Sequence, residues 1–301
     1  MNNAHHKKQI WIGVGLALLA TIIWAGNFII ARGVRKEIPP VALAFYRWLT
    51  ATIVILPFAW KYFIAEIGII KQRPLFFLLT AATGVSMYNT FIYIAGHFSS
   101  AINMAILCTC SIPIISVILA RIFLGEKIPP LRIIGMLVSL AGIVVLLSHG
   151  KLDDLLHFKF TDGDWWILTA AFTFSVYNTL VKKKPAGIHH INFLFVIFLL
   201  GIIILVPFYV YELNHVGGFV INFSHIAEIL YIGVGASVIC FIIWNKAIGA
   251  LGAGRTALFG NLIPVFSSAE AVFVLNESIS TIQILSFLLV VAGLVIATIR
   301  K

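Results

Sequence analysis

Charged side chains are scarce in this sequence. Of its 301 residues only 11% are Asp, Glu, Lys or Arg, whereas 61% are hydrophobic, and the mean hydropathy is +1.05. A single soluble core could not bury so much apolar surface. The sequence therefore predicts an all-α integral membrane protein, with the lipid bilayer as its main partner.

Three classes of function lack their signatures here. No G-x-x-x-x-G-K-[ST] motif occurs, and this motif forms the phosphate-binding loop of many ATP-driven proteins. The histidines fall near the ends of apolar stretches or between them, without the intramembrane clusters of His, Asp or Glu that a membrane-embedded enzyme needs. No basic patch interleaved with aromatic residues indicates nucleic acid. We expect neither an enzyme nor a nucleic-acid-binding protein, and no cofactor is implied.

Cysteine is rare as well. Cys108, Cys110 and Cys240 all lie within apolar stretches. Cys108 and Cys110 are two residues apart, so on a helix they do not share a face. We interpret the three as small apolar residues rather than as a metal site.

Long apolar stretches, by contrast, recur along the whole chain. A bilayer core about 30 Å thick needs roughly 20 residues of helix. Ten stretches of this kind occur, at residues 10–30, 41–60, 74–95, 100–120, 132–148, 164–181, 191–211, 226–245, 255–275 and 282–299. They predict ten transmembrane helices, and the alternating pattern of a β-barrel is absent.

The positive charges predict the orientation of these helices. With the N-terminus in the cytoplasm, fifteen Lys and Arg residues fall on the inner side and five on the outer side. This distribution agrees with the positive-inside bias. We therefore expect both termini in the cytoplasm, and the net charge of +10 reflects membrane topology.

The two halves of the chain resemble each other. "CSIPIISVILARIFLGEKI" at residues 110–128 aligns without a gap to "NLIPVFSSAEAVFVLNESI" at residues 261–279, at a constant shift of 151 that pairs Pro113 with Pro264. Half of the chain is about as long as this shift. The shift therefore indicates two five-helix repeats, one before residue 150 and one after it.

Two such repeats define the predicted architecture. We assign residues 1–149 to the first repeat and residues 150–301 to the second. An odd number of spans in each repeat places the second copy upside down in the membrane. Inverted repeats are the architecture of secondary transporters, whose substrate site lies near the bilayer midplane between the halves.

Motifs in the first half carry a family resemblance. "TIIWAGNFIIARGV", "PPVALAFYRWLTATIVILPF" and "PIISVILARIFLGEKIPPLRIIGMLVSLAGIVVLL" resemble the EamA-type members of the drug/metabolite transporter superfamily. The motif positions are Trp24-Ala-Gly-Asn27, Phe-Tyr-Arg47-Trp and Leu-Gly-Glu126, and the second half departs from them, with Phe174 where Trp24 would sit. The resemblance implies a ten-helix basket whose cavity lies between helices 1 to 4 and 6 to 9, with helices 5 and 10 at the edge. It also implies ATP-independent export of amino acids and related metabolites across the bacterial cytoplasmic membrane.

Polar and aromatic side chains point to the cavity wall. Ser86, Asn89 and Tyr93 fall at i, i+3 and i+7, so a helix places them on one face. Rings combined with amides suit a neutral, amphipathic small-molecule substrate such as an amino acid. Packing between helices is the alternative interpretation, because small and amide residues also hold membrane helices together. The expected substrate-binding residues are Trp24, Asn27, Ser86, Tyr88, Asn89, Tyr93, Tyr177, Asn178, Ser237 and Trp244.

Two prolines and two charges are candidates for coupling or gating. Pro113 and Pro264 lie in the middle of predicted helices, where a proline releases a backbone carbonyl and usually kinks the helix. Glu270 lies inside a predicted span, where an acid costs roughly 2.5 kcal/mol or more. Arg47 is buried at a comparable depth. For Glu270 we consider a proton-coupling role, a structural pair with Arg47 or another base, and a neutral hydrogen-bonded acid.

These observations converge on a secondary transporter. We expect it to export small neutral or amphipathic metabolites, amino acids or their analogues first, by alternating access with proton coupling through Glu270. The alternatives are a superfamily transporter for drugs, nucleobases or sugar phosphates, and an uncoupled facilitator. Phosphorylated or cationic substrates would need several cavity cations or several acids, and the predicted spans offer one of each.

Overall fold

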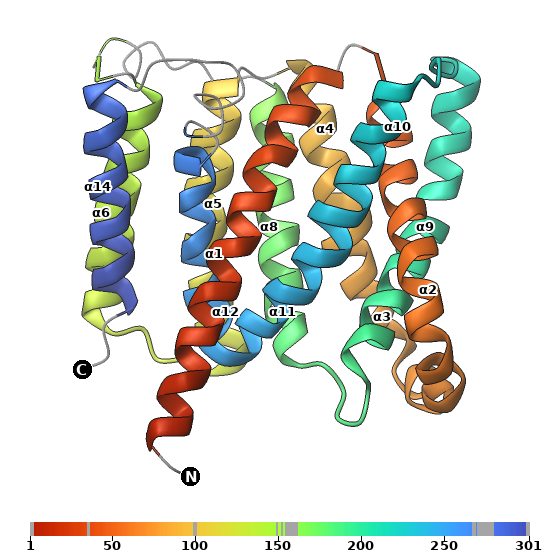
Figure 1. Ribbon diagram of the computed structural model, residues 1–301, viewed down its shortest axis with the longest axis horizontal. Helices are drawn as coiled ribbons and strands as arrows, with labels where there is room; N and C mark the ends of the chain where they lie inside the picture. Colours follow the sequence, from red (N-terminus) through yellow and green to blue (C-terminus); the bar gives the residue numbers. More distant parts are fainter. Residues whose placement is uncertain are drawn as a thin grey trace.

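The computed structural model describes residues 3–34, 37–98, 101–148, 150–151, 153, 162–266, 269 and 280–298. Within these residues every regular element is a helix, and the helices run side by side in one bundle (Figure 1). In that view α1 begins and α14 ends at the lower end of the bundle, whereas α2 begins and α9 ends at the upper end. The prediction of an all-α protein is confirmed for the described part of the chain.

The first half follows the predicted stretches closely. Its elements are α1 (Asn3–Val34), α2 (Pro40–Gln72), α3 (Pro74–Ala81), the π-helical segment η1 (Ala82–Met87), α4 (Tyr88–Phe98), α5 (Ala101–Leu124) and α6 (Pro130–Leu147). A proline opens α2, α3 and α6, where it is favoured because the first turn of a helix needs no intrahelical N–H donor.

The predicted end of the second stretch at residue 60 is wrong. The helix α2 continues to Gln72, through Pro57 and past the first charge at Lys61. A charge ends an apolar stretch but does not end a helix, and residues 61–72 contain no Pro. Glu66 in this extension contacts the connection between α8 and α9 and the start of α9.

The second half contains the corresponding series. Its described elements are α8 (Asp162–Lys182), α9 (His190–His215), α10 (Phe223–Leu230), the π-helical segment η2 (Tyr231–Ile239), α11 (Cys240–Leu251), α12 (Ala253–Leu258), the 3₁₀ segment η3 (Phe259–Leu262) and α14 (Thr281–Thr298). The predicted span 255–275 is described only up to residue 266 and at residue 269. Glu270 lies outside the described residues.

Several helices have the length and composition of membrane spans. Within the described residues, the stretches long and apolar enough to cross a bilayer are Lys8–Gly26, Pro40–Gln72, Pro74–Phe98, His190–His215 and Phe223–Leu251. Shorter apolar helices cover Ser111–Leu124, Pro130–Val145 and Ile284–Ala297. These stretches support a multi-pass membrane protein, and the number of ten spans stays a prediction.

The two π-helical segments occupy equivalent places in the two halves. A shift of 151 moves η1 onto residues 233–238, which lie inside η2. Such segments are rare and occur frequently at functional sites, because bonding from i to i+5 changes the direction in which the following side chains point. Each segment lies within a longer helical run, η1 between α3 and α4 and η2 between α10 and α11.

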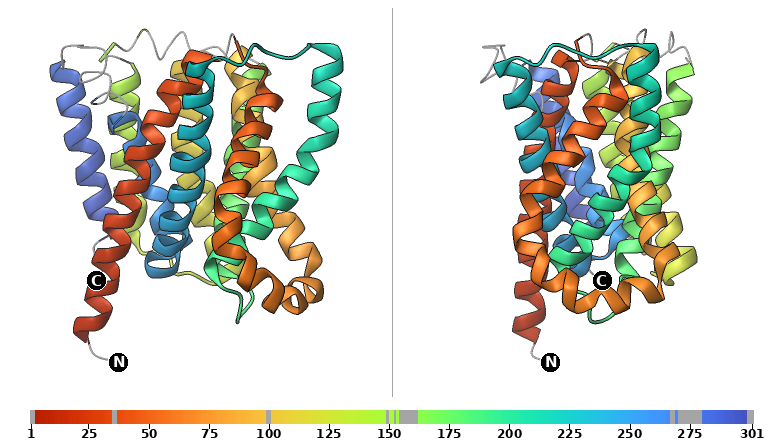
Figure 2. Two further views of the ribbon diagram at one scale, coloured as in Figure 1. Left: turned by 45° about the vertical axis from the view of Figure 1, so that its right-hand side comes forward. Right: turned by 90° about the vertical axis from the view of Figure 1, so that its right-hand side faces the viewer.

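The shift of 151 also relates the helices that pack together. The helices α2 and α9 are counterparts and pack together, as do α6 and α14, while α1 packs on α11 and α4 on α8. At one edge of the bundle, α6 and α14 lie side by side (Figures 1 and 2). Added Cβ atoms at Gly135 and Gly293 would each overlap the backbone of the opposite helix. Glycine therefore allows the close approach of these two helices.

Candidate functional site

Arg47 of α2 lies at the centre of a buried hydrogen-bond network. Its side chain is only 2% exposed. Nε donates to Oγ of Ser237 at 2.7 Å, and Nη2 donates to the carbonyl oxygen of Ala236 at 3.2 Å. Nη1 donates to Oδ1 of Asn89 and to the hydroxyl of Tyr93, both at 2.9 Å. One guanidinium group therefore joins α2 and α4 of the first half to η2 of the second.

Asn89 has a second polar group that no described residue satisfies. Its Oδ1 accepts from Arg47, and because a guanidinium can only donate, this bond fixes which way the amide points. The amide nitrogen Nδ2 is buried without a hydrogen-bond partner among the described residues. A buried donor without a partner costs free energy, so it is a natural contact for a ligand oxygen.

Aromatic rings surround this network. The Trp24 and Trp244 rings lie 4.8 Å apart, and Tyr88 stacks on Phe174 at 4.4 Å. Nε1 of Trp24 donates to the Ala236 carbonyl at 2.9 Å, the same oxygen that accepts from the guanidinium group. The Trp24 ring is thus held in place by a hydrogen bond as well as by packing.

A cavity of about 50 Å³ opens between the network and these rings. It lies among helices of both halves. A buried water needs roughly 10–15 Å³ measured in this way, so the cavity holds a few waters but not a metabolite. In this conformation the helices around the cavity must therefore separate before a substrate can enter.

Seven of the predicted site residues line this cavity. They are Trp24, Arg47, Tyr88, Asn89, Tyr93, Pro113 and Trp244. Ser237 does not line the cavity, but its hydroxyl oxygen accepts a hydrogen bond from the guanidinium group of Arg47, which does. The fold therefore brings together predicted site residues from α1, α2, α4, α5 and α11. Their role in binding stays a proposal.

Tyr177 and Asn178 form a second layer behind the cavity wall. The hydroxyl of Tyr177 donates to Oδ1 of Asn245 at 2.6 Å. Oδ1 of Asn178 accepts from Nε1 of Trp244 at 3.0 Å, so Asn178 fixes the orientation of that ring. Both residues are fully buried and position the wall rather than line it.

Ser86 is not among the residues that line the cavity, unlike Asn89 and Tyr93. Its hydroxyl donates to the carbonyl of Gly201 in α9 at 2.9 Å. Ser86 belongs to the π-helical segment η1, where bonding from i to i+5 departs from the α-helical spacing on which the prediction of a shared face rests. The side chain of Asn27 lies outside the described part of the structure.

The two prolines that the shift of 151 pairs have different surroundings. Pro113 lines the cavity, and α5 continues through it. Pro264 follows the 3₁₀ segment η3, and Gly260, whose carbonyl Pro264 cannot bond, also lines the cavity. Only the second-half proline is therefore preceded by a change of helix type.

Sequence reasoning missed several apolar members of the wall. Phe174 and Phe241 contribute rings, and Ile92, Ile112, Cys108 and Ile263 complete the apolar surface. A single apolar residue inside a membrane span carries no signal that separates a cavity wall from a lipid-facing surface. Among the described residues no group of three or more His, Cys, Asp or Glu side chains could hold a metal ion.

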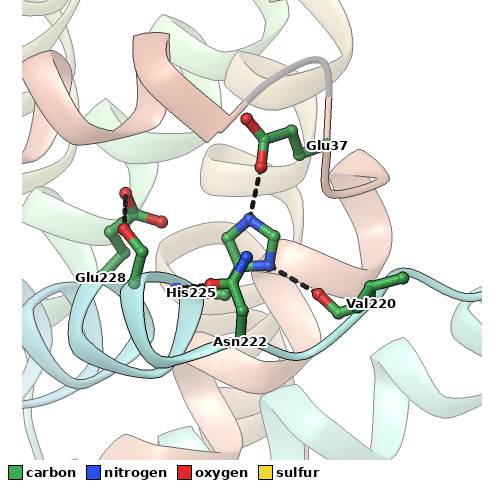
Figure 3. Close-up of polar contacts among 6 residues, drawn as sticks. Glu37, Val220, Asn222, His225 and Glu228 are labelled. Carbon is green, nitrogen blue, oxygen red and sulfur yellow. Dashed lines mark hydrogen bonds and ion pairs between the residues drawn. The ribbon is translucent and has the colours of Figure 1, made fainter.

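Polar contacts also fasten both ends of the bundle. At the upper end, Nε2 of His225 lies 2.6 Å from Oε2 of Glu37, and Nδ1 lies 2.7 Å from the carbonyl of Val220 (Figure 3). Asn222 caps α10 by accepting from the backbone N–H of His225 at 2.8 Å. The contact joins the connection between α1 and α2 to the start of α10.

At the lower end, Glu66 fastens the extension of α2. Its carboxylate accepts from the backbone N–H of His189 at 2.9 Å and from Nδ2 of Asn192 at 2.7 Å. Burial lowers the pKa of Lys184 in the same connection, and Glu66 partly offsets that effect. The extension thus ties the first half to the link between α8 and α9.

The motif glutamate Glu126 lies at this end too. Its carboxylate is 3.9 Å from Nη1 of Arg132. A Cβ at Gly252, where φ is +93°, would lie 2.9 Å from Oε1 of Glu126. Only glycine therefore suits the turn between α11 and α12 while Glu126 packs against it.

Comparison with known proteins places this arrangement among transporters. An uncharacterized transporter of Archaeoglobus fulgidus is 28% identical over 95% of this chain and 97% of its own length. A probable amino-acid metabolite efflux pump of Escherichia coli is 24% identical over 93% of each chain. An S-adenosylmethionine uptake transporter of Rickettsia bellii is 25% identical over 92% of this chain and 89% of its own.

A solved structure and a family model also match nearly the whole chain. One crystal structure superposes with a TM-score of 0.74 over 97% of this chain and 96% of its own, at 19% identity, which concerns the fold alone. The model of the EamA-like transporter family matches the chain twice, at residues 11–148 and 161–299. The motifs around Trp24, Arg47 and Glu126 lie within the first match. The chain therefore belongs to the EamA-like transporter family, and it is a transporter rather than an enzyme.

Proposed function

We propose that this protein exports small amphipathic metabolites that carry a carboxylate, amino acids with apolar or aromatic side chains first, across the cytoplasmic membrane. The observation that carries the proposal is the composition of the central cavity. Six aromatic side chains surround one buried guanidinium group and one amide donor without a described partner, and no acidic residue is among the described lining.

In this proposal, different parts of the cavity wall bind the carboxylate and the side chain of the substrate. The substrate carboxylate meets Nδ2 of Asn89 beside the positive charge of Arg47, because both groups lie on the same wall. The apolar side chain packs against the rings of Trp24, Phe174 and Trp244, which contribute area and favour edge or offset stacking. Phosphorylated substrates need more cations than the described lining offers. Cationic drugs need an acidic side chain, and the described lining has none.

The architecture proposed with this function is the inverted repeat. We propose ten spans, with repeats at 1–149 and 150–301 and both termini in the cytoplasm. Two features support this architecture: the π-helical segments lie at equivalent positions in the two halves, and the counterpart helices α2 and α9, like α6 and α14, pack against each other. Alternating access then moves one half against the other around the cavity. Export is the proposed direction, supported by the efflux pump among the relatives, and proton coupling through Glu270 is part of the same proposal.

Transport into and out of proteoliposomes tests the substrate class. We expect labelled phenylalanine or leucine to be carried, and unlabelled phenylalanine to compete at least about tenfold better than phenylalaninamide or phenethylamine, which lack the carboxylate. Equal competition by all three compounds would remove the carboxylate from the proposal.

A matched pair of tryptophan variants tests the cavity. Trp244→Leu removes a ring from the wall, and we expect the apparent KM to rise about tenfold or more. Trp165→Leu removes a ring that is 66% exposed on the surface of α8, and we expect normal transport. If both variants transport like the original protein at equal expression, the wall is packing and the binding site lies elsewhere.

A further inference from the structure

A second cavity, of about 130 Å³, lies at the upper end of the bundle. It is formed by the start of α2, the end of α9 and the connection to α10, and Arg47 is not among its lining residues. Its wall includes Tyr46, Tyr209, Glu212 and Phe219. The central cavity shares none of these residues.

Three aromatic rings line this wall, and the ring of Tyr46 stands nearly at right angles to the other two. The Tyr46 ring makes an angle of 84° with Tyr209 and of 85° with Phe219, at centroid distances of 5.8 and 5.6 Å. The hydroxyls of Tyr46 and Tyr209 bond to each other at 3.0 Å. The hydroxyls thus satisfy one another, and the rings offer aromatic surface from different directions.

Glu212 contributes a buried negative charge to the same wall. The residue is 8% exposed, and its two oxygens accept from the backbone N–H groups of Val41 at 3.0 Å and Ala42 at 2.7 Å. These bonds hold the carboxylate at the start of α2. An ionised carboxylate accepts at about four positions, so these two bonds leave about half of its capacity.

Aromatic faces beside a carboxylate recognise organic cations. Ring faces attract ammonium groups through their quadrupole, and quaternary ammonium ligands are bound in aromatic cages of this kind. No basic side chain lies in the described wall to compete with such a ligand. A hard metal ion is a poorer match, because Ca²⁺ and Mg²⁺ require more oxygen ligands than one carboxylate supplies.

We propose that this upper cavity binds an organic ammonium group, which Glu212 attracts and the rings of Tyr46, Tyr209 and Phe219 surround. The site is separate from the central cavity and does not depend on the function proposed above. The same chemistry belongs to a lipid headgroup such as phosphatidylethanolamine and to a free amine in solution.

Binding of choline to the purified full-length protein tests this site. We expect labelled choline to bind, and 3,3-dimethylbutan-1-ol, in which a carbon replaces the charged nitrogen, to compete at least about tenfold less well than unlabelled choline. Phe219→Leu should weaken binding between about threefold and about thirtyfold, because one cation–π contact is lost. Phe219→Tyr keeps a ring face and should restore binding.

Two glutamate variants separate charge from folding. Glu212→Gln should weaken choline binding at least about tenfold. Glu66→Gln alters a carboxylate that also accepts a backbone N–H, but at the lower end, and should bind choline normally. Equal binding of choline and its uncharged analogue, or unchanged binding in both Phe219→Leu and Glu212→Gln, overturns the proposal. So does binding that Trp244→Leu abolishes, because that result places the cation in the central cavity.

The membrane composition distinguishes the two sources of the ligand. In nanodiscs of phosphatidylglycerol alone, choline should bind as in detergent. If phosphatidylethanolamine in the nanodisc competes with choline, the ammonium group of a lipid is the supported occupant. If it does not compete, a free amine is the supported occupant.

Discussion

Nε of Arg47 in the first half donates to Oγ of Ser237 in the second half at 2.7 Å. The serine belongs to η2, and its own hydroxyl donates to the carbonyl of Ile232 at 2.8 Å. This relationship fixes the guanidinium group against the π-helical segment. A residue that belongs to the family motif of the first half is therefore oriented by the second half.

The bond makes Ser237→Ala destabilising. A hydrogen bond to a buried charged group contributes about 1.5–3 kcal/mol, so we expect the free energy of unfolding in detergent to fall by about 2 kcal/mol. Arg47→Lys should cost more, because one ammonium group cannot donate in the directions of the guanidinium fork. Ser224→Ala, at an exposed bond of 3.3 Å to Glu228, is the control and should change little. Similar losses for Ser237→Ala and Ser224→Ala would contradict the central role of the network.

The close packing of η1 on α8 makes a prediction about glycine. A Cβ at Gly84 would overlap the Tyr177 ring, whereas nothing lies within 4 Å of a Cβ at Gly96 in α4. We expect Gly84→Ala to lower the free energy of unfolding by about 1–3 kcal/mol through overpacking. Gly96→Ala should be neutral or stabilising, because alanine favours helix over glycine by about 1 kcal/mol. Unfolding curves of the two variants in the same detergent provide the measurement, and equal stability would show that α8 does not pack so closely on η1.

The contact between His225 and Glu37 predicts a dependence on pH. Both ring nitrogens of His225 face oxygens, one of a carboxylate and one of a backbone carbonyl (Figure 3). An ionised carboxylate and a carbonyl can only accept, so the ring bonds to both only when it carries two protons. The stabilisation is therefore present at low pH and lost as rising pH removes the second proton.

Thermal unfolding measures this effect. Between about pH 5 and about pH 8, where histidine charge changes, we expect the original protein to lose more stability than His225→Gln does. The difference should be no more than about 1 kcal/mol, because Glu37 is 60% exposed and solvent screens the pair. Glu37→Gln should reduce the pH dependence in the same way. An unchanged pH dependence in both variants would exclude the pair as its origin.

Much of the fold follows from features that the sequence displays directly. Length and apolarity of the stretches predict the helices, and the prolines at residues 40, 74 and 130 mark helix starts. Trp24 belongs to a family motif and is expected to bind substrate, whereas Arg47 is a candidate for coupling or gating because it is a charge within a predicted span. Hydrophobicity alone places neither side chain in the cavity, since it measures transfer into lipid and not the direction of a side chain.

The features that the sequence did not predict depend on contacts between distant residues. Ser86 of η1 donates to Gly201 of α9, and no local propensity distinguishes the π-helical segments from an α-helix. The upper cavity depends on Glu212 meeting the backbone of Val41, which is 171 residues away in the chain. Such contacts arise only when the helices are packed, so residue spacing within one helix cannot show them.

Glu270 leads to the last prediction, which concerns coupling. The sequence places this acid inside the span predicted at 255–275, where a carboxylate is costly and usually faces the protein interior as an ion or proton site. Glu270→Gln keeps the size and hydrogen-bonding groups of the side chain but cannot exchange a proton. In proteoliposomes with an imposed pH gradient, we expect the variant to lose uphill efflux while it retains substrate exchange at equal concentrations on both sides. Glu228→Gln, at the upper end in α10, is the matched control and should retain both activities. Full pH-driven efflux by Glu270→Gln would assign the carboxylate to folding or gating and would make the protein a facilitator or a transporter coupled through another group.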